Sequence, residues 1–140
     1  MSSSESDPDR ANLRVKGSEA VARGVEAARA FADEQWLTGE ETARLCIIVE
    51  ELVTNLYDHA GLAADQEVEL GFASEPDGIH LVLVDPTPPF DPRAAAKTGK
   101  SDRGGGAGID IVQAWAQIIG YERTADGNRL EVVMPVGQLG

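Results

Sequence analysis

The sequence has one cysteine, no long apolar run and few basic residues. Because Cys46 has no second cysteine to pair with, we expect it to be a small buried hydrophobic residue in a reducing compartment. No stretch approaches the ~18 apolar residues of a membrane span, and "MSSSESDPDR" lacks an apolar segment behind a basic start. We therefore expect a cytoplasmic protein that makes no membrane contact.

The charge is strongly one-sided, since 12 lysines and arginines stand against 24 aspartates and glutamates and the net charge is -12. A surface that binds nucleic acid or an anionic membrane broadly needs a positive field. Direct nucleic-acid binding is therefore excluded as a main function, and a bound phosphate would have to be held locally.

At 140 residues the chain is most simply one domain with one core. Residues 1–10 lack aromatic and β-branched side chains, so burial cannot offset the entropy lost on ordering them. We predict a disordered tail over residues 1–10 and a single domain over residues 11–140.

Apolar periodicity predicts the elements of the first half. "NLRVKG" alternates like a short strand, and Ser18 is a candidate N-cap for a helix with apolar positions Val21, Val25, Ala28, Ala32 and Trp36. Thr38 and Glu41 form a capping box for a second helix of about 22 residues that ends at Gly61. Its expected buried stripe consists of Leu45, Ile48, Leu52 and Leu56.

Two strand pairs and a third helix are predicted in the second half. "EVELGFASEPDGIHLVLVDP" gives two strands joined at "SEPDG", and one face carries Val68, Leu70 and Phe72. Residues 86–108 show no periodicity and form a long loop, which is uncommon unless functional. A helix then runs from about Gly108 to a stop at Gly120, with an apolar side of Ile111, Val112, Trp115 and Ile119. "YERTADGNRLEVVMP" closes as a hairpin with Asp126–Gly127 as its turn.

The elements therefore alternate between strands and helices in a fixed order: strand, two helices, two strands, a helix and two strands. Helices with a single apolar stripe and strands with an alternating pattern each need one covering layer. We predict an α/β (α+β) two-layer sandwich, in which a mixed, mainly antiparallel sheet is covered on one face by three helices.

The second helix carries a polar stripe beside its apolar one. Glu51, Asn55 and His59 recur at i, i+4 and i+8, so they project from one face. A carboxylate and an amide oxygen one turn apart can hold Mg²⁺, which takes hard oxygen ligands and keeps several waters. The alternative is an ordinary solvated face.

Two further segments carry residue types suited to a nucleotide. Asp85 ends an apolar strand in "VDPTPPFDPR" and could accept a hydrogen bond from an exocyclic amine, although an Asp-Pro turn alone is ordinary. "RGGGAGIDIV" places glycines before a helix whose free N–H groups form an anion site, unless the stretch is a flexible linker. The cations before it, which could neutralise polyphosphate, are Lys97, Lys100 and Arg103.

Together and in this order, these segments resemble the nucleotide-binding boxes of the GHKL ATPase superfamily, the Bergerat fold. The similarity is closest to its small anti-sigma factor serine/threonine kinases, the HATPase_c_2 family. "EELVTNLYDHA" resembles the asparagine box, "DPTPPFD" the first glycine box and "GGGAGIDIV" the second. The resemblance spans about residues 11 to 136, and the ordered triple is specific although each motif alone is weak.

The resemblance implies roles for individual positions. Glu51 matches the general base, Asn55 the Mg²⁺ ligand, and Asp85 the aspartate that binds the adenine amino group of ATP. Glycines 106 and 108 match the phosphate-facing turn, and residues 93–103 match the lid. The positions expected around the nucleotide also include Asp58, Thr87, Phe90, Lys97, Lys100, Arg103, Gly105, Gly106, Ala107 and Gly108.

Two positions depart from the wider superfamily, and one has no chemical role. Thr87 and Pro89 stand where the superfamily has glycines, although the small kinases often carry proline in this turn. His59 occupies a position where the subfamily commonly has histidine, and a packing or helix-end role is expected for it. Glu50 lies about 100° around the helix from Glu51 and is the weaker candidate for the base.

By this resemblance the protein is expected to be an ATP- and Mg²⁺-dependent serine/threonine protein kinase and anti-sigma factor that phosphorylates a STAS-domain anti-sigma factor antagonist. A sigma factor and a second copy of the chain, in a homodimer, are the other expected partners. The alternatives are a non-catalytic ATP-binding module that sequesters a protein partner and a histidine-kinase-like ATPase domain. The latter is disfavoured because 140 residues leave no separate helical hairpin for a phosphoacceptor histidine.

Overall fold

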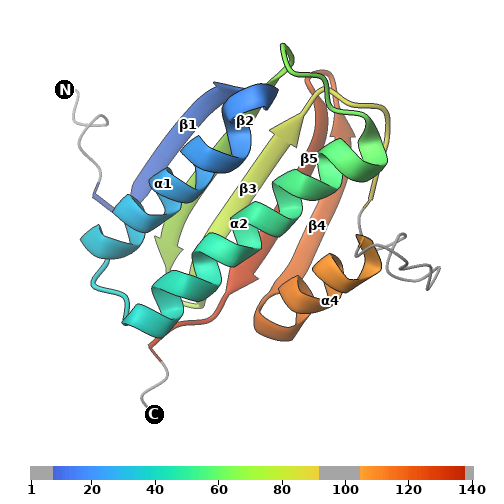
Figure 1. Cartoon of the computed structure of the whole chain (residues 1–140). Helices are drawn as coiled ribbons and strands as arrows, with labels where there is room; N and C mark the ends of the chain where they lie inside the picture. Colours follow the sequence, from blue (N-terminus) through green and yellow to red (C-terminus); the bar gives the residue numbers. More distant parts are fainter. Residues whose placement is uncertain (1–7, 92–104, 138–140) are drawn as a thin grey trace.

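Three helices cover one face of a five-stranded sheet (Figure 1). The computed structural model describes residues 8–91 and 105–137, with the side chains of residues 105–108 left out. The helices are α1 (Ala20–Glu34), α2 (Gly39–Ala60) and α4 (Gly105–Trp115), and a short 3-10 turn (Gly17–Glu19) precedes α1. The strands are β1 (Arg10–Lys16), β2 (Glu67–Glu75), β3 (Gly78–Asp85), β4 (Gln117–Thr124) and β5 (Gly127–Met134). The predicted two-layer α+β architecture is confirmed.

Neighbouring strands of the sheet are all antiparallel, in the order β1-β2-β3-β5-β4. A mixed, mainly antiparallel sheet was expected, and the described strands form no parallel pair. Leu70, Leu83 and Leu130 lie opposite one another across three strands and are all buried. Because side chains alternate along a strand, this register sends one half of each strand's residues to the helices and the other half to the uncovered face.

Helix α2 has the caps and the buried stripe that were predicted. Thr38 Oγ1 accepts a hydrogen bond from Glu41 N at 3.0 Å, and Thr38 N donates to Glu41 Oε1 at 2.9 Å. Gly61 ends the helix with a φ of 75°, a left-handed conformation that favours glycine. The residues that α2 buries include the four predicted leucine and isoleucine positions and Cys46, which is also buried as expected.

The start and the end of α1 differ from the prediction. The helix begins at Ala20 after the 3-10 turn, and Glu19 rather than Ser18 is its N-cap residue. Trp36 lies beyond the helix, is 91% exposed and has a φ of 58°. This left-handed residue turns the chain so that Leu37 packs against the core. The buried side of α1 consists of Ala20, Gly24, Ala28, Phe31 and Ala32.

The third helix is shorter than predicted, and the last hairpin is longer. Helix α4 ends at Trp115 and β4 begins at Gln117, so Ile119 and Gly120 belong to a strand. Pairing with β5 overrides the helical period of this stretch, and a β-bulge between Ile118 and Gly120 absorbs an extra residue.

The turn of this hairpin is one residue earlier than the predicted Asp126–Gly127. Thr124 pairs with Gly127, so the turn consists of Ala125 and Asp126. Gly127 has a φ of 125°, and a Cβ atom at this position would overlap the carbonyl oxygen of Asp85. Glycine is therefore required for β5 to begin this close to the end of β3.

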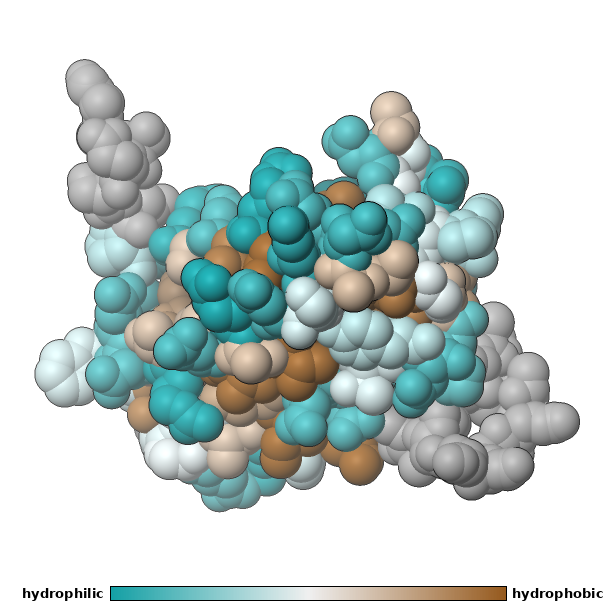
Figure 2. Space-filling model, turned by 45° about the horizontal axis from the view of Figure 1, so that its top comes forward, coloured by the Kyte–Doolittle hydropathy of each residue, from teal (hydrophilic) through white to brown (hydrophobic). Residues whose placement is uncertain are grey.

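Hydrophilic side chains predominate on the face seen in Figure 2, and apolar surface is limited to patches between them. The described large apolar side chains that stay exposed are Trp36, Ile111 and Ile119. Within the described ranges, no helix combines the length and the apolar character needed to span a bilayer.

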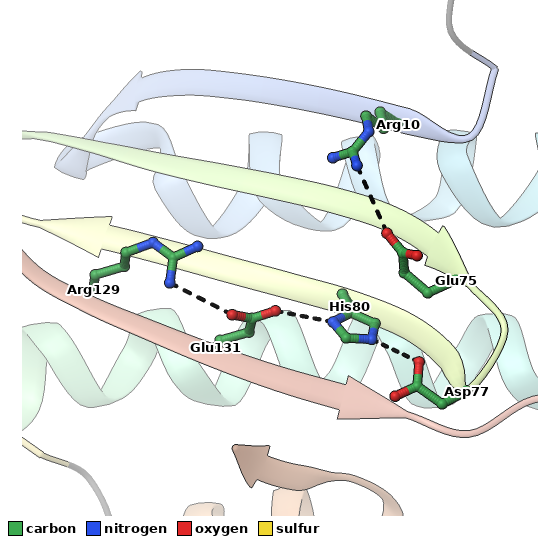
Figure 3. A network of polar contacts seen from close by, with 6 residues as sticks. All are labelled: Arg10, Glu75, Asp77, His80, Arg129 and Glu131. Atoms are coloured by element: carbon green, nitrogen blue, oxygen red, sulfur yellow. Dashed lines mark hydrogen bonds and ion pairs between the residues drawn. The ribbon is translucent and has the colours of Figure 1, made fainter. Parts of the chain in front are cut away.

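The uncovered face of the sheet carries a network of polar contacts (Figure 3). His80 Nε2 lies 2.7 Å from Asp77 Oδ1, and His80 Nδ1 lies 2.9 Å from Glu131 Oε2. Arg129 Nη1 is 3.5 Å from the other oxygen of Glu131. Only the imidazolium form of His80 has two N–H groups, so only this form donates to both carboxylates.

The pKa of His80 reflects this position. Partial burial opposes the charge and would lower the pKa, but the hydrogen bonds to Glu131 and Asp77 outweigh it and raise the pKa above the ordinary 6.5. Two other charged groups of this face, Arg10 and Glu75, lie 3.7 Å apart, and Arg14 lies within 4 Å of Glu67 and Glu69. The protonated His80 therefore joins the β2–β3 turn to β5.

We predict that this network stabilises the fold most below neutral pH. Because the folded pKa of His80 lies above the unfolded value, its stabilisation is fully present below about pH 6.5 and is lost as the pH rises through the raised pKa. Urea titrations at increasing pH should show a falling midpoint for the wild type and a flatter profile for His80→Gln. His59→Gln leaves the network intact and is the control; equal slopes in all three proteins would contradict the prediction.

Candidate functional site

The polar stripe of α2 is only partly exposed. Asn55 is 5% exposed, and its Nδ2 atom has no hydrogen-bond partner among the described residues. A buried amide without a partner costs free energy, so its presence in a native fold requires an explanation such as a bound ligand. Glu51, one turn before it, is half-buried, and Asp58, one turn after it, is exposed.

The Glu51 carboxyl group is suited to accept a proton. Burial raises its pKa above the usual range of a glutamate, and the negative charges of Glu50 and Asp58 raise it further. A carboxylate with a raised pKa is a stronger base than an exposed one, and a pKa closer to the working pH favours proton transfer. These properties match the general base expected at Glu51, whose role stays a prediction.

The polar stripe ends against the segment that follows β3. The rings of His59 and Phe90 are stacked, with their centroids 6.2 Å apart and an angle of 11° between their planes. In Figure 1 the C-terminal end of α2 likewise lies beside this segment. The contact gives His59 a packing role of the kind expected for it.

Asp85 ends β3 on the helix side of the sheet and is only 4% exposed. Its Oδ1 atom accepts hydrogen bonds from Thr87 N at 3.0 Å, from the Thr87 hydroxyl group and from Asn128 Nδ2 at 3.0 Å. The register of β3 and β5 places Asp85 directly opposite Asn128. A carboxylate can be buried here because these donors replace water.

The β4–β5 hairpin contributes three polar residues that no motif in the sequence indicated. The Tyr121 hydroxyl group donates to Asn128 Oδ1 at 2.6 Å, and Arg123 Nη1 donates to the same oxygen at 3.1 Å. Tyr121 Oη also accepts from Phe90 N at 3.1 Å, and Arg123 Nη1 also donates to Thr87 O at 2.7 Å. The one available signal was an asparagine placed directly after Gly127, at an inward position of a strand.

A small cavity joins α2 to these residues. Its walls are formed by Leu52, Leu56, Leu83, Asp85, Phe90, Tyr121, Asn128 and Leu130. The leucines on either side of Asn55 along the helix are among them, whereas Asn55 itself is not. At about 10 Å³ the cavity has room for one water-sized molecule, far below the ~300–1,000 Å³ of typical ligand sites. A purine can therefore enter only after the surrounding side chains move apart.

Two larger hollows, of about 440 and 420 Å³, involve the uncovered face of the sheet. The first is lined by residues such as Asn12, Gly71 and Val82, and ion pairs join several of its charged side chains (Figure 3). The second reaches the end of β3 at Pro86. Neither includes the polar stripe of α2. We place the candidate site at the small cavity because buried polar groups from several segments converge there.

The glycine-rich segment begins a helix earlier than predicted. Helix α4 starts at Gly105 rather than near Gly108, so the predicted phosphate-facing glycines, Gly106 and Gly108, lie in its first turn together with Gly105 and Ala107. The N–H groups of a first helical turn have no partner within the helix and can bind anions. Helix α4 packs against α2 (Figure 1). The predicted lid of residues 93–103, with Lys97, Lys100 and Arg103, lies outside the described residues.

The described residues contain no group of three or more His, Cys, Asp or Glu side chains that could hold a metal ion. Mg²⁺ does not need such a group, because it often takes one or two protein oxygens and completes its shell with phosphates and water. The carboxamide oxygen of Asn55 is a hard ligand of the kind that this single-ligand role needs. The unpaired atom is the amide nitrogen, which donates and would instead bind an acceptor such as a phosphate oxygen.

A known family model matches most of the chain. The model, HATPase_c_2, is described as a histidine kinase-like ATPase domain and matches residues 15–134. No curated protein matches the sequence. The matched range includes α2, Asp85 and α4, so the family expected from the three motifs is confirmed.

We predict that the two buried asparagines respond differently to loss of the amide group. Asn128→Leu should lower the free energy of unfolding by roughly 1–3 kcal/mol, because it leaves several buried partners without a hydrogen bond. Asn55→Leu should leave stability unchanged or raise it by about 1 kcal/mol, because it removes a polar atom that has no described partner. Urea unfolding followed by tryptophan fluorescence measures both; equal losses would show that Asn55 is satisfied within the protein.

Proposed function

This chain belongs to the histidine kinase-like ATPase domain family, and from that premise we propose that it is a serine/threonine protein kinase that acts as an anti-sigma factor. Membership makes it an ATP-binding, kinase-like module. The finer proposal is that it transfers the γ-phosphate of ATP to a serine of a STAS-domain anti-sigma factor antagonist.

The buried amide of Asn55 is the observation that carries this proposal. Its Nδ2 atom has no partner among the described residues, although an apolar side chain at this position would avoid that cost. One helical turn away, Glu51 has a raised pKa, also at a cost to stability when the carboxyl group is ionised. Two unfavourable polar groups on one helical face support a site selected for binding and catalysis.

Asn55 is the residue that would hold Mg²⁺ through its carboxamide oxygen. When bound, the ion would neutralise negative charge on the triphosphate oxygens. The remaining ligands would be phosphate oxygens and water, which agrees with the lack of a described carboxylate cluster. Burial fixes the amide in place, so its orientation costs little entropy at the moment of binding.

Glu51 would act as the general base. Its carboxylate would take the proton of the substrate serine hydroxyl group while that oxygen forms a bond to the γ-phosphorus. The bond between the γ-phosphorus and the oxygen that bridges it to the β-phosphate would break, and ADP would leave with that electron pair. The raised pKa of Glu51 supports this role, because a carboxylate whose pKa is closer to neutral pH accepts a proton more readily.

The nucleotide would lie between α2 and the turn after β3. The apolar walls Leu52 and Leu56 would contact the base, and Asp85 would accept a hydrogen bond from the adenine amino group. Thr87 and Phe90 would border the base from the turn. The N–H groups at the start of α4 would face the phosphates, and this arrangement requires the small cavity to open on binding.

The proposed partners come from the family resemblance, and charge gives a reason for one of them to dissociate after phosphorylation. Phosphorylation of the antagonist would add about 1.5 to 2 negative charges. Because the present chain carries a net charge of -12, the modified antagonist would be repelled and would leave. The surface that it leaves would then bind a sigma factor, and we propose that the chain acts as a homodimer.

The test uses labelled ATP, Mg²⁺ and a cognate STAS-domain protein. Glu51→Gln should lower phosphate transfer by about 10²–10⁴-fold, because the base is removed. It should keep ATP affinity and an equal or higher thermal stability at neutral pH, because it removes a carboxylate that is disfavoured by burial and by Glu50 and Asp58. Glu50→Gln is the matched control, since Glu50 is exposed on another face and should retain activity.

The other outcomes separate the alternative functions. Normal transfer by Glu51→Gln would rule out this residue as the base. ATP binding without any transfer by the wild type would support a non-catalytic module that sequesters a partner. Label on a separate histidine phosphotransfer protein would instead support a histidine-kinase-like ATPase.

A further inference from the structure

The turn after β3 depends on the β4–β5 hairpin for its hydrogen bonds. Three of its five residues, from Pro86 to Phe90, are prolines and have no N–H group to donate. The two N–H groups that remain are both used, because Thr87 N donates to Asp85 Oδ1 and Phe90 N donates to Tyr121 Oη. Asn128 and Arg123 of the hairpin donate to Thr87 O, and Pro88 O accepts from Asn128 and from the Thr87 hydroxyl group.

Asn128 is the centre of these contacts and is only 2% exposed. Its Nδ2 atom lies 3.0 Å from Asp85 Oδ1, 3.2 Å from Thr87 O and 3.0 Å from Pro88 O. A carboxamide nitrogen has two hydrogens, so these acceptors share them. Asn128 thereby joins the carboxylate at the end of β3 to the backbone of the turn.

Arg123 and Tyr121 determine which way the Asn128 amide faces. Arg123 Nη1 can only donate, so the Asn128 atom 3.1 Å away must be the oxygen. The Tyr121 hydroxyl group donates to the same oxygen at 2.6 Å. The nitrogen of Asn128 is therefore directed toward Asp85, and a rotated amide would place an oxygen against that carboxylate.

The consequence for Asp85 is a fixed carboxylate with unequal oxygens. Thr87 N, the Thr87 hydroxyl group and Asn128 Nδ2 all bind Oδ1. Three donors on one oxygen hold the group against rotation, and Asp85 lines the small cavity together with Asn128. The arrangement leaves Oδ2 as the oxygen available to a ligand.

We propose that Asn128, oriented by Arg123 and Tyr121, is a positioning residue that directs Oδ2 of Asp85 to the exocyclic amino group of the bound purine and sets the preference for adenine. The inference rests on the proposed function, in which the chain binds ATP with Asp85 at the base. Discrimination between a purine with the amino group and one without it would then depend on β4 and β5, although neither strand carries a recognised nucleotide motif.

The test compares the dissociation constants of ATP and of purine riboside triphosphate, which lacks only the amino group, by calorimetry at fixed Mg²⁺. The wild type should bind ATP at least about tenfold more tightly than purine riboside triphosphate. Asp85→Ala sets the reference for lost discrimination. Asn128→Ser and Arg123→Gln should weaken the binding of ATP alone. The ratio of the two dissociation constants should then fall to within about twofold of unity. Glu122→Gln, a neighbouring exposed change on β4, is the matched control and should keep the wild-type ratio.

A merely structural role predicts a different result. Lower thermal stability with equal weakening of both nucleotides, and an unchanged ratio, would overturn the inference. If Asn128→Ser does not fold, Arg123→Gln and Tyr121→Phe decide by the same ratio. Failure of the wild type to bind ATP would overturn the proposed function itself, whereas lost discrimination in Asp85→Ala alone would overturn only the inference.

Discussion

The antiparallel pairing of β3 with β5 is the constraint on which the candidate site depends. It places Asp85 opposite Asn128 and aligns Leu83 with Leu130 two residues further along. A shift of register by one residue would turn all of these side chains to the other face of the sheet. The apolar pairs thus favour the register that also brings the two polar side chains together, and Gly127 permits the close approach that this register needs.

One face of helix α2 stabilises the fold, and another carries polar groups that lower its stability. Its buried leucines, isoleucine and valines each contribute roughly 1.5–3 kcal/mol by leaving water, and both of its ends are capped. Asn55 and Glu51 oppose this, because one has an unpaired buried atom and the other has a carboxyl group with a raised pKa. The helix can accommodate these groups because its apolar edge contributes more free energy than they cost.

Local signals predicted α2 and the β2–β3 hairpin well, because their determinants lie close together in sequence. Thr38 and Glu41 are three residues apart, and the strand alternation around Leu70 continues for a whole element. The same reasoning was wrong at Trp36 and at Ile119. Both extend an apolar helical period, but chain reversal before Leu37 and pairing with β5 place them outside helices. The spacing of apolar residues does not show at which residue a helix ends, because that residue depends on pairing and packing with distant parts of the chain.

The sequence by itself determined the family, the order of elements and the candidates Glu51, Asn55 and Asp85, because each belongs to a short motif with its own spacing. The tertiary structure decided that Asp85 is held by Asn128, and that Tyr121 and Arg123 orient that amide. It also decided that Asn55 is buried without a described partner. These facts depend on contacts between residues far apart in the chain, whose geometry is fixed only when the sheet pairs and the helices cover it.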